Sequence, residues 1–208
     1  MSISRLVTFG CSLTYGYGLS DCYLPNTNFG PNPSKQVYPA LLGEEFNIPI
    51  LNESKPGCSN SYITHKILNY QFQKYDFVIV QWTSPLRSTL FLKDGELPIG
   101  PWIKEDYCKQ YYTIVDYEHL MIETMKNLHH IELYLNSREI PFIFATNATN
   151  SGMYLTDKVG WNINTPIINF TKFYIDRALD KLHAGPESHK QIANHLLTIL
   201  KEKYDTTN

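Results

Sequence analysis

Short β-rich runs alternate with helical segments along this chain, and that alternation is what most constrains its fold. The runs with strand character cover residues 3–9, 48–53, 76–82 and 141–148. The run at 76–82 (DFVIVQW) is almost continuously apolar, which is typical of a parallel strand covered on both faces. Strands that alternate with helices predict a parallel sheet with helices packed on both of its faces.

Between these strands, apolar residues recur at helical spacing, which predicts amphipathic helices. Pro39 and Pro186 suit the first turns of two of these helices, and Ser59 or Asn60 suits the cap of another. We expect helices at 38–46, from about 60 to 70, at 116–138, at 166–179 and from 186 toward the C-terminus.

Two stretches lack a clean period. Residues 85–115 carry Gly, Pro and many aromatic side chains, so we interpret them as an insertion, and residues 149–165 have the composition of a loop. The chain has 208 residues and shows no internal repeat or linker. One domain over 1–208 is therefore the economical interpretation.

Charge and composition argue against several classes of protein. Lys and Arg number 18 against 20 Asp and Glu, a balance unlike that of a dedicated nucleic-acid binder. No apolar run is long enough to cross a bilayer, and the N-terminus has the character of a first strand rather than a signal peptide. Cys11, Cys22, Cys58 and Cys108 have no metal-binding spacing, so we expect free thiols and a cytoplasmic setting.

The carboxyl ends of parallel strands are where ligands bind in open α/β sheets. We therefore expect the chemistry in the C-terminal region and in the four segments that leave those strand ends, at 10–17, 54–60, 82–87 and 147–151.

Two of these regions carry reactive side chains. Ser12 lies in FGCSLTYG, directly after the first strand, where its hydroxyl can point out of the sheet edge. Asp180 and His183 stand three apart in DKLHAGPE, a spacing that lets the carboxylate hold Nδ1 of the imidazole. Taken alone, Ser12 is more simply a turn residue, and the other two more simply a solvated Asp and a His beside a helix.

Together, Ser12 and the distant Asp180 and His183 resemble the GDSL-type, or SGNH, hydrolase superfamily. That family has a nucleophilic Ser after its first strand and a D-x-x-H block near its C-terminus. Gly57 matches the second-block glycine, and the end of the strand at 76–82 stands where the third block belongs. The likeness spans nearly the whole chain in the family's order.

The resemblance implies a three-layer α/β/α sandwich, flavodoxin-like, around a mainly parallel sheet of about five strands. It also implies a serine esterase or deacylase. His183 would take the proton of Ser12 as its oxygen attacks an ester carbonyl, and Asp180 would orient the imidazole. Neither a metal nor an organic cofactor is required by this chemistry.

The family's oxyanion donors are where this sequence departs from the family's pattern. The N–H groups of Ser12 and Gly57 are expected donors, joined by Ser84 or Asn60. No Asn stands at the third-block position, where the sequence has Thr83 and Ser84, and Asn60 or Asn147 is an alternative source of an amide. Loss of one such donor costs roughly 10²–10³ in rate. Cys11 replaces the Asp of the family's first block, and the alignment of the blocks keeps Ser12 as the nucleophile.

Aromatic and Asn side chains fill the predicted loops, a composition that suits a sugar ring and equally suits small satellite cores. Arg87 either binds a carboxylate or phosphate of the substrate or forms a surface ion pair. The candidate substrate-binding residues are Tyr15, Trp82, Thr83, Arg87 and Asn147. Further aromatic residues of these loops are Tyr17, Tyr23, Trp102, Tyr107, Tyr111, Tyr112, Tyr154 and Trp161.

The expected partner is thus a small-molecule or glycan ester, with no nucleic acid and no membrane, and the oligomeric state is left open. Two alternatives remain. An acyltransferase would use the same three side chains. A binding or structural module would keep the fold without efficient chemistry, which the missing third-block Asn favours. Phosphate-binding glycine motifs are absent, which disfavours nucleotide binding.

Overall fold

A five-stranded parallel sheet forms the centre of the fold. The computed structural model describes residues 3–24, 30–148 and 163–203. The strands lie in the order β2-β1-β3-β6-β7, and every neighbouring pair is parallel. In chain order they are β1 (Arg5–Phe9), β2 (Ile50–Asn52), β3 (Asp76–Trp82), β6 (Phe142–Thr146) and β7 (Ile167–Asn169).

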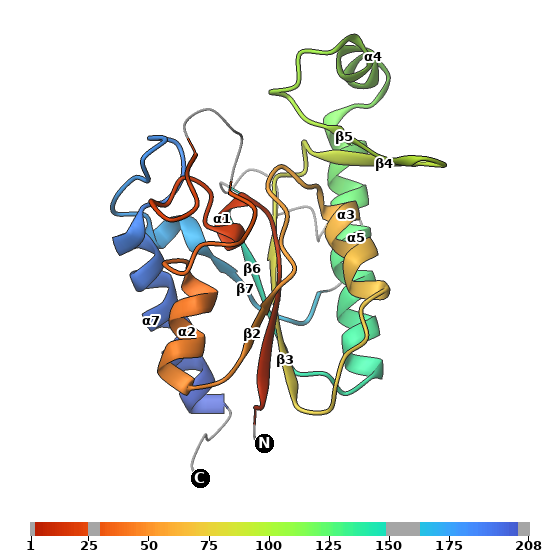
Figure 1. Cartoon of the computed structure of the whole chain (residues 1–208). Helices are drawn as coiled ribbons and strands as arrows, with labels where there is room; N and C mark the ends of the chain where they lie inside the picture. The colour runs from red at the N-terminus through yellow and green to blue at the C-terminus, as the bar shows by residue number, and fades with distance from the viewer. Residues whose placement is uncertain (1–2, 25–29, 149–162, 204–208) are drawn as a thin grey trace.

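Helices cover both faces of this sheet (Figure 1). The helices α2 (Tyr38–Phe46) and α7 (Pro186–Lys203) pack on one face. The helices α3 (Asn60–Leu68) and α5 (Tyr117–Ser137) pack on the other. The three-layer α/β/α sandwich predicted from the alternating pattern is therefore confirmed, with a sheet of the expected size.

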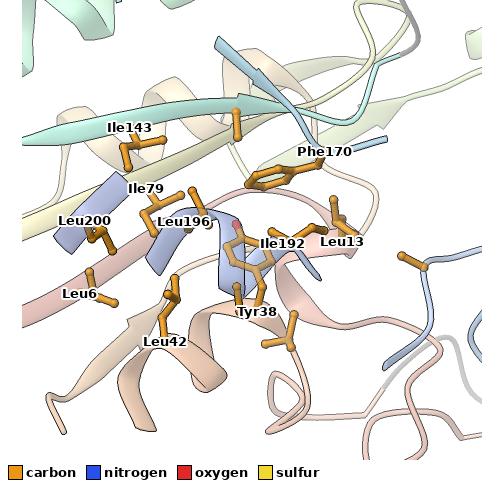
Figure 2. Packing of buried hydrophobic residues seen from close by; sticks show 14 of the residues in the cluster. Leu6, Leu13, Tyr38, Leu42, Ile79, Ile143, Phe170, Ile192, Leu196 and Leu200 are labelled. Carbon is orange, nitrogen blue, oxygen red and sulfur yellow. The ribbon is translucent and has the colours of Figure 1, made fainter. Parts of the chain in front are cut away.

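The near-continuous apolar character of β3 follows from this double cover. Phe77 and Ile79 point into the core beneath α2 and α7, whereas Val78 and Val80 point into the core beneath α3 and α5. Figure 2 shows the first of these cores. In it, Ile79 lies with residues of the neighbouring strands and of both covering helices, namely Leu6, Ile143, Tyr38, Leu42, Ile192, Leu196 and Leu200. Successive strand side chains alternate between faces, so each layer receives every second residue.

Residues 166–179 were predicted to be helical, and this prediction was wrong. They form the edge strand β7 and a single 3₁₀ turn at Phe170–Phe173. The buried carboxylate of Glu132 on α5 accepts hydrogen bonds from the backbone N–H groups of Asn164 and Thr165, at 3.3 and 2.6 Å. These contacts hold the chain just before β7 beside the free edge of β6. Pairing with β6 then outweighs the helical spacing of the local sequence.

The insertion at 85–115 is more regular than its sequence suggested. It consists of the antiparallel hairpin β4 (Ser88–Leu92) and β5 (Gly95–Ile99), followed by the helix α4 (Asp106–Ile114). In Figure 1 it lies at the end of the molecule where β1 leads into the short helix α1 (Ser12–Tyr15). This end of the sheet carries the candidate site.

The four cysteines are free, as expected, and all four are buried. Over residues 3–24, 30–148 and 163–203, the structure contains no helix whose length and apolar character would let it cross a membrane.

Candidate active site

Ser12, His183 and Asp180 meet at the carboxyl end of the sheet. Nε2 of His183 lies 3.0 Å from Oγ of Ser12, and Nδ1 lies 2.5 Å from Oδ2 of Asp180. An ionised carboxylate only accepts hydrogen bonds, so Nδ1 carries the proton and Nε2 presents its lone pair to Ser12. The side chain of Asp180 is 8% exposed and that of His183 is 29% exposed, so the imidazole is the more accessible of the two.

The turn that holds Asp180 and His183 is fixed by its own backbone. The N–H of Ala178 donates to the carbonyl of His183, and the N–H groups of Leu182 and His183 both donate to Oδ1 of Asp180 at 3.0 Å. Burial raises the pKa of Asp180, but the hydrogen bonds from His183 and Leu182 outweigh it and hold that pKa below its usual value. The carboxylate therefore remains charged while it orients the imidazole.

The first loop packs directly against this turn. The N–H of Leu179 donates to the carbonyl of Gly18 at 3.0 Å, and the ring of Tyr17 lies 4.8 Å from the imidazole of His183. A Cβ on Gly18 would lie 2.8 Å from the carboxyl carbon of Asp180, and the backbone there has φ of +87°. Only glycine fits this contact without strain.

A buried glutamine holds the turn that presents Ser12. Oε1 of Gln81 accepts from the N–H of Cys11 at 3.1 Å, from its thiol at 3.2 Å, and from the hydroxyl of Thr14 at 3.2 Å. Nε2 of the same side chain donates to Oδ1 of Asn147 at 3.1 Å. Sequence reasoning missed Gln81, although a single amide inside the apolar run DFVIVQW was a signal of a buried polar network.

A pocket of about 610 Å³ opens beside these residues. The main domain contributes the reactive side chains and the loop after β2, while the insertion contributes the opposite wall. Its lining residues are Ser12, Tyr17, Lys55, Pro56, Gly57, Cys58, Tyr62, Arg87, Thr89, Glu96, Pro98, Trp102, Ile103, Leu182 and His183.

Ion pairing and hydrogen bonding fasten the insertion to the main domain across this pocket. Nζ of Lys55 lies 2.8 Å from Oε2 of Glu96 on β5 and 4.6 Å from the centre of the Tyr62 ring. The hydroxyls of Ser59 and Thr89 lie 2.7 Å apart. Burial lowers the pKa of Lys55, and the bond to Glu96 outweighs it, so that the pKa is raised. Lys55 thus stays protonated, and its positive charge is balanced by the carboxylate of Glu96 in the pocket wall.

Of the expected oxyanion donors, some line the pocket and others lie outside it. Gly57 lines the pocket and has φ of +77°, with only the ring of Trp102 near the position of a Cβ. Asn60 lies outside the pocket lining, where its Nδ2 donates to the Thr83 carbonyl and the Thr124 hydroxyl and its Oδ1 accepts the N–H of Thr83. Ser84 also lies outside, and its hydroxyl accepts the N–H of Leu86 at 3.3 Å.

Of the five expected substrate-binding residues, only Arg87 lines the pocket. Trp82 is buried in the core, edge-on to Phe144, because β3 turns it away from the site. The hydroxyl of Tyr15 donates to the carbonyl of Gly30 at 2.7 Å.

The other two expected residues support the site from beneath. The N–H of Thr83 donates to Asn60 at 2.8 Å, and Asn147 lies under the turn that carries Ser12, with its Nδ2 3.7 Å from the sulfur of Cys11. Among the loop aromatics, Tyr17 and Trp102 line the pocket, and Tyr154 and Trp161 lie outside the described residues.

No metal site accompanies this arrangement within the part of the chain that the structure describes: it brings together no group of three or more His, Cys, Asp or Glu side chains placed to hold an ion.

Solved structures with the same fold include esterases. A carbohydrate esterase with divergent catalytic and non-catalytic binding functions superposes with a TM-score of 0.65 at 16% identity, over 99% of this chain and 67% of its own. An acetyl xylan esterase from the rumen bacterium Butyrivibrio proteoclasticus gives 0.61 at 13% identity, over 100% of this chain and 66% of its own. A G-D-S-L family lipolytic protein from Desulfitobacterium hafniense gives 0.56 at 14% identity, over 95% and 99%.

The chain therefore has the fold of the GDSL lipolytic proteins and these carbohydrate esterases, which confirms the fold resemblance predicted from its sequence. It spans about two thirds of the length of the carbohydrate esterases. No protein-family model and no curated protein matches the sequence.

Proposed function

We propose that this protein is a serine esterase that cleaves an acyl ester through Ser12, His183 and Asp180. The observation that carries the proposal is the 3.0 Å contact between Nε2 of His183 and Oγ of Ser12 at the wall of an open pocket. A hydroxyl becomes a useful nucleophile when an adjacent base accepts its proton, and the base must itself be oriented by a third group. The charged Asp180 meets that last requirement.

The reaction follows from these contacts. Oγ of Ser12 bonds to the ester carbonyl carbon while its proton passes to Nε2 of His183, and the carbonyl oxygen takes the negative charge. As the tetrahedral intermediate collapses, the alcohol leaves with the proton from Nε2, and an acyl group remains on Ser12. Water, deprotonated by the same imidazole, then releases the acid and restores the Ser12 hydroxyl. An acyltransferase would differ only in the hydroxyl that resolves the acyl-enzyme.

We propose an acylated glycan as the substrate class. Tyr17, Tyr62 and Trp102 give the pocket aromatic faces beside the polar Lys55 and Glu96. Such faces pack against the CH side of a sugar ring, while the polar groups meet its hydroxyls. The likeness to an acetyl xylan esterase, and to a Clostridium thermocellum carbohydrate esterase solved with cellohexaose, supports the same class. We further propose that residues 1–208 act as one domain, whose insertion supplies part of the substrate site.

A fluorophosphonate probe tests the reaction, because it bonds covalently to an activated serine. We expect labelling at Ser12 that His183→Ala abolishes, and no labelling of Ser12→Ala. An intact protein that resists the probe would instead support a binding module. Comparing kcat/KM for acetylated xylo-oligosaccharides with that for 4-nitrophenyl acetate tests the substrate class. Equal or lower activity on the sugar would count against a glycan substrate.

A further inference from the structure

Among the described residues, the pocket contains one cation that forms no ion pair. Arg87 lines it, and within the described ranges neither Nε nor Nη1 of its guanidinium has a hydrogen-bond partner, although both atoms are enclosed. The other cation of the pocket, Lys55, is already paired with Glu96. This guanidinium is partly buried, and leaving its enclosed N–H groups without a hydrogen-bond partner has a free-energy cost. Its persistence beside a nucleophile therefore points to a negative charge that arrives during function.

Aromatic packing holds this guanidinium in place. Its central carbon lies 4.6 Å from the ring centre of Trp102, a distance at which a cation is attracted to the ring face. The half-exposed ring packs closely over Gly100, where a Cβ would lie 2.5 Å from it, and its edge lies 3.9 Å from the position of a Cβ on Gly57. Trp102 thus lies between Arg87, on which its ring packs, and Gly57, the second-block glycine.

The charge of Arg87 acts on the turn that carries the nucleophile. Complete burial raises the pKa of the Cys11 thiol, yet the charge of Arg87, followed by hydrogen bonds from Leu13, Thr83 and Ser12, lowers it below its usual value. The sulfur of Cys11 is 3.9 Å from Oγ of Ser12. A negative charge formed next to Ser12 lies in the same favourable field.

Arg87 also stands near the position of a donor that this chain lacks. It follows the end of β3, where the family's third block supplies an Asn that this chain lacks. The nearby amides are already committed: Asn60 bonds to Thr83 and Thr124, and Asn147 bonds to Gln81 beneath Cys11.

We propose that Arg87 replaces the missing third-block amide as a catalytic residue that stabilises the oxyanion, an inference that rests on the proposed esterase function. When Ser12 bonds to the carbonyl carbon, the electron pair of the C=O double bond moves to oxygen, and the guanidinium faces that charge with the N–H groups of Ser12 and Gly57. The charge returns when the C=O bond re-forms and the alcohol leaves with the proton held by His183. Arg87 stays protonated throughout.

The test uses 4-nitrophenyl acetate, which carries no anionic group, with Arg87→Gln, Arg87→Lys and the control Arg138→Gln. Arg138 also stacks on an aromatic ring, that of Tyr134, but on the exposed surface at the end of α5. We expect Arg87→Gln to lower kcat by roughly 10²–10³ with little change in KM, as for the loss of one oxyanion donor. Arg87→Lys should restore part of this, fluorophosphonate labelling of Ser12 should slow in parallel, and Arg138→Gln should match the wild type.

The outcomes separate the two proposals. If the wild type is active and Arg87→Gln keeps its kcat on the neutral ester, losing activity only on esters that carry a carboxylate, then Arg87 binds a substrate anion and the oxyanion role is wrong. If the wild type neither turns over esters nor labels at Ser12, the esterase function fails and the role of Arg87 falls with it. Thermal unfolding checks each variant. Should Arg87→Gln unfold, Arg87→Met, which keeps a stem against Trp102, takes its place with the same expectations.

Discussion

Nε2 of His183 lies 3.0 Å from Oγ of Ser12, although 171 positions of the chain separate the two residues. The contact joins the loop after β1 to the turn before α7, and Tyr17 and Gly18 pack along the same junction. The proposed proton relay therefore depends on how the two segments dock against each other as much as on Ser12, His183 and Asp180 themselves.

Removing either end of this contact should eliminate the chemistry. We expect Ser12→Ala and His183→Ala each to reduce kcat by about 10⁴–10⁶-fold, because nucleophile and base act as one unit. The double variant should be no worse than either single one. Steady-state kinetics on 4-nitrophenyl acetate measures this, and simple multiplication of the two single losses would contradict a shared relay.

Gly18→Ala should disturb the orientation of His183 without touching any reactive atom. The new Cβ would meet the Asp180 carboxyl at 2.8 Å on a backbone with φ of +87°. We expect kcat to fall toward the level of Asp180→Asn, for which the loss of the correct tautomer costs roughly 10⁴ in related relays. Gly95→Ala is the matched control, since Gly95 also has positive φ but nothing within 4 Å of its Cβ position. Equal activity of the two variants would show that the carboxylate tolerates displacement.

Gln81→Leu should loosen the turn that presents Ser12. The change removes the acceptor of the buried Cys11 N–H and of its thiol, and the Thr14 hydroxyl keeps only its contact with the Tyr38 hydroxyl. Each unsatisfied group costs about 1–3 kcal/mol, so we expect the free energy of unfolding to drop by roughly 2–4 kcal/mol. Urea denaturation measures the drop, with exposed Gln110→Leu as the control. Fluorophosphonate labelling at an unchanged rate would show that Gln81 serves stability alone.

His189 should make stability fall in mild acid. Burial lowers its pKa to about 4, with the nearby Asp176 raising it and His183 lowering it further, and its Nδ1 accepts the N–H of Tyr38 at 3.4 Å. The unfolded chain binds the proton near pH 6.5 and the folded chain only near pH 4, so stability is lost as the pH falls between these values. From pH 7 to pH 5 we expect a loss of about 2 kcal/mol.

His189→Gln should remove most of that pH dependence. Chemical denaturation at pH 7 and pH 5 compares the two proteins. The lowered pKa values of Asp176 and Asp180 affect stability only as the pH falls below their ordinary range, outside this window. An equal loss in the variant would assign the effect to another group.

Much of the fold could be predicted because the spacing of apolar residues along the chain indicates which segments form strands and which form helices. The run at 76–82 matches β3 residue for residue, and the helix predicted at 38–46 matches α2. The predicted caps also hold, since Ser59 accepts the N–H of Tyr62 at the start of α3. Ser12, Asp180 and His183 were found from the family's block order, and the fold brings them together.

By itself, the sequence determined the alternation of strands and helices and the segments that hold the three reactive side chains. Tertiary structure decided the rest. Pairing with β6 turned residues 167–169 into an edge strand, and adjacent Gln81 and Trp82 took opposite roles because neighbouring side chains of a strand face opposite layers. Periodicity depends on residues that are close along the chain. Which strand pairs at the sheet edge, which residues line the pocket and which amides already form hydrogen bonds all depend on partners that only the folded chain brings near.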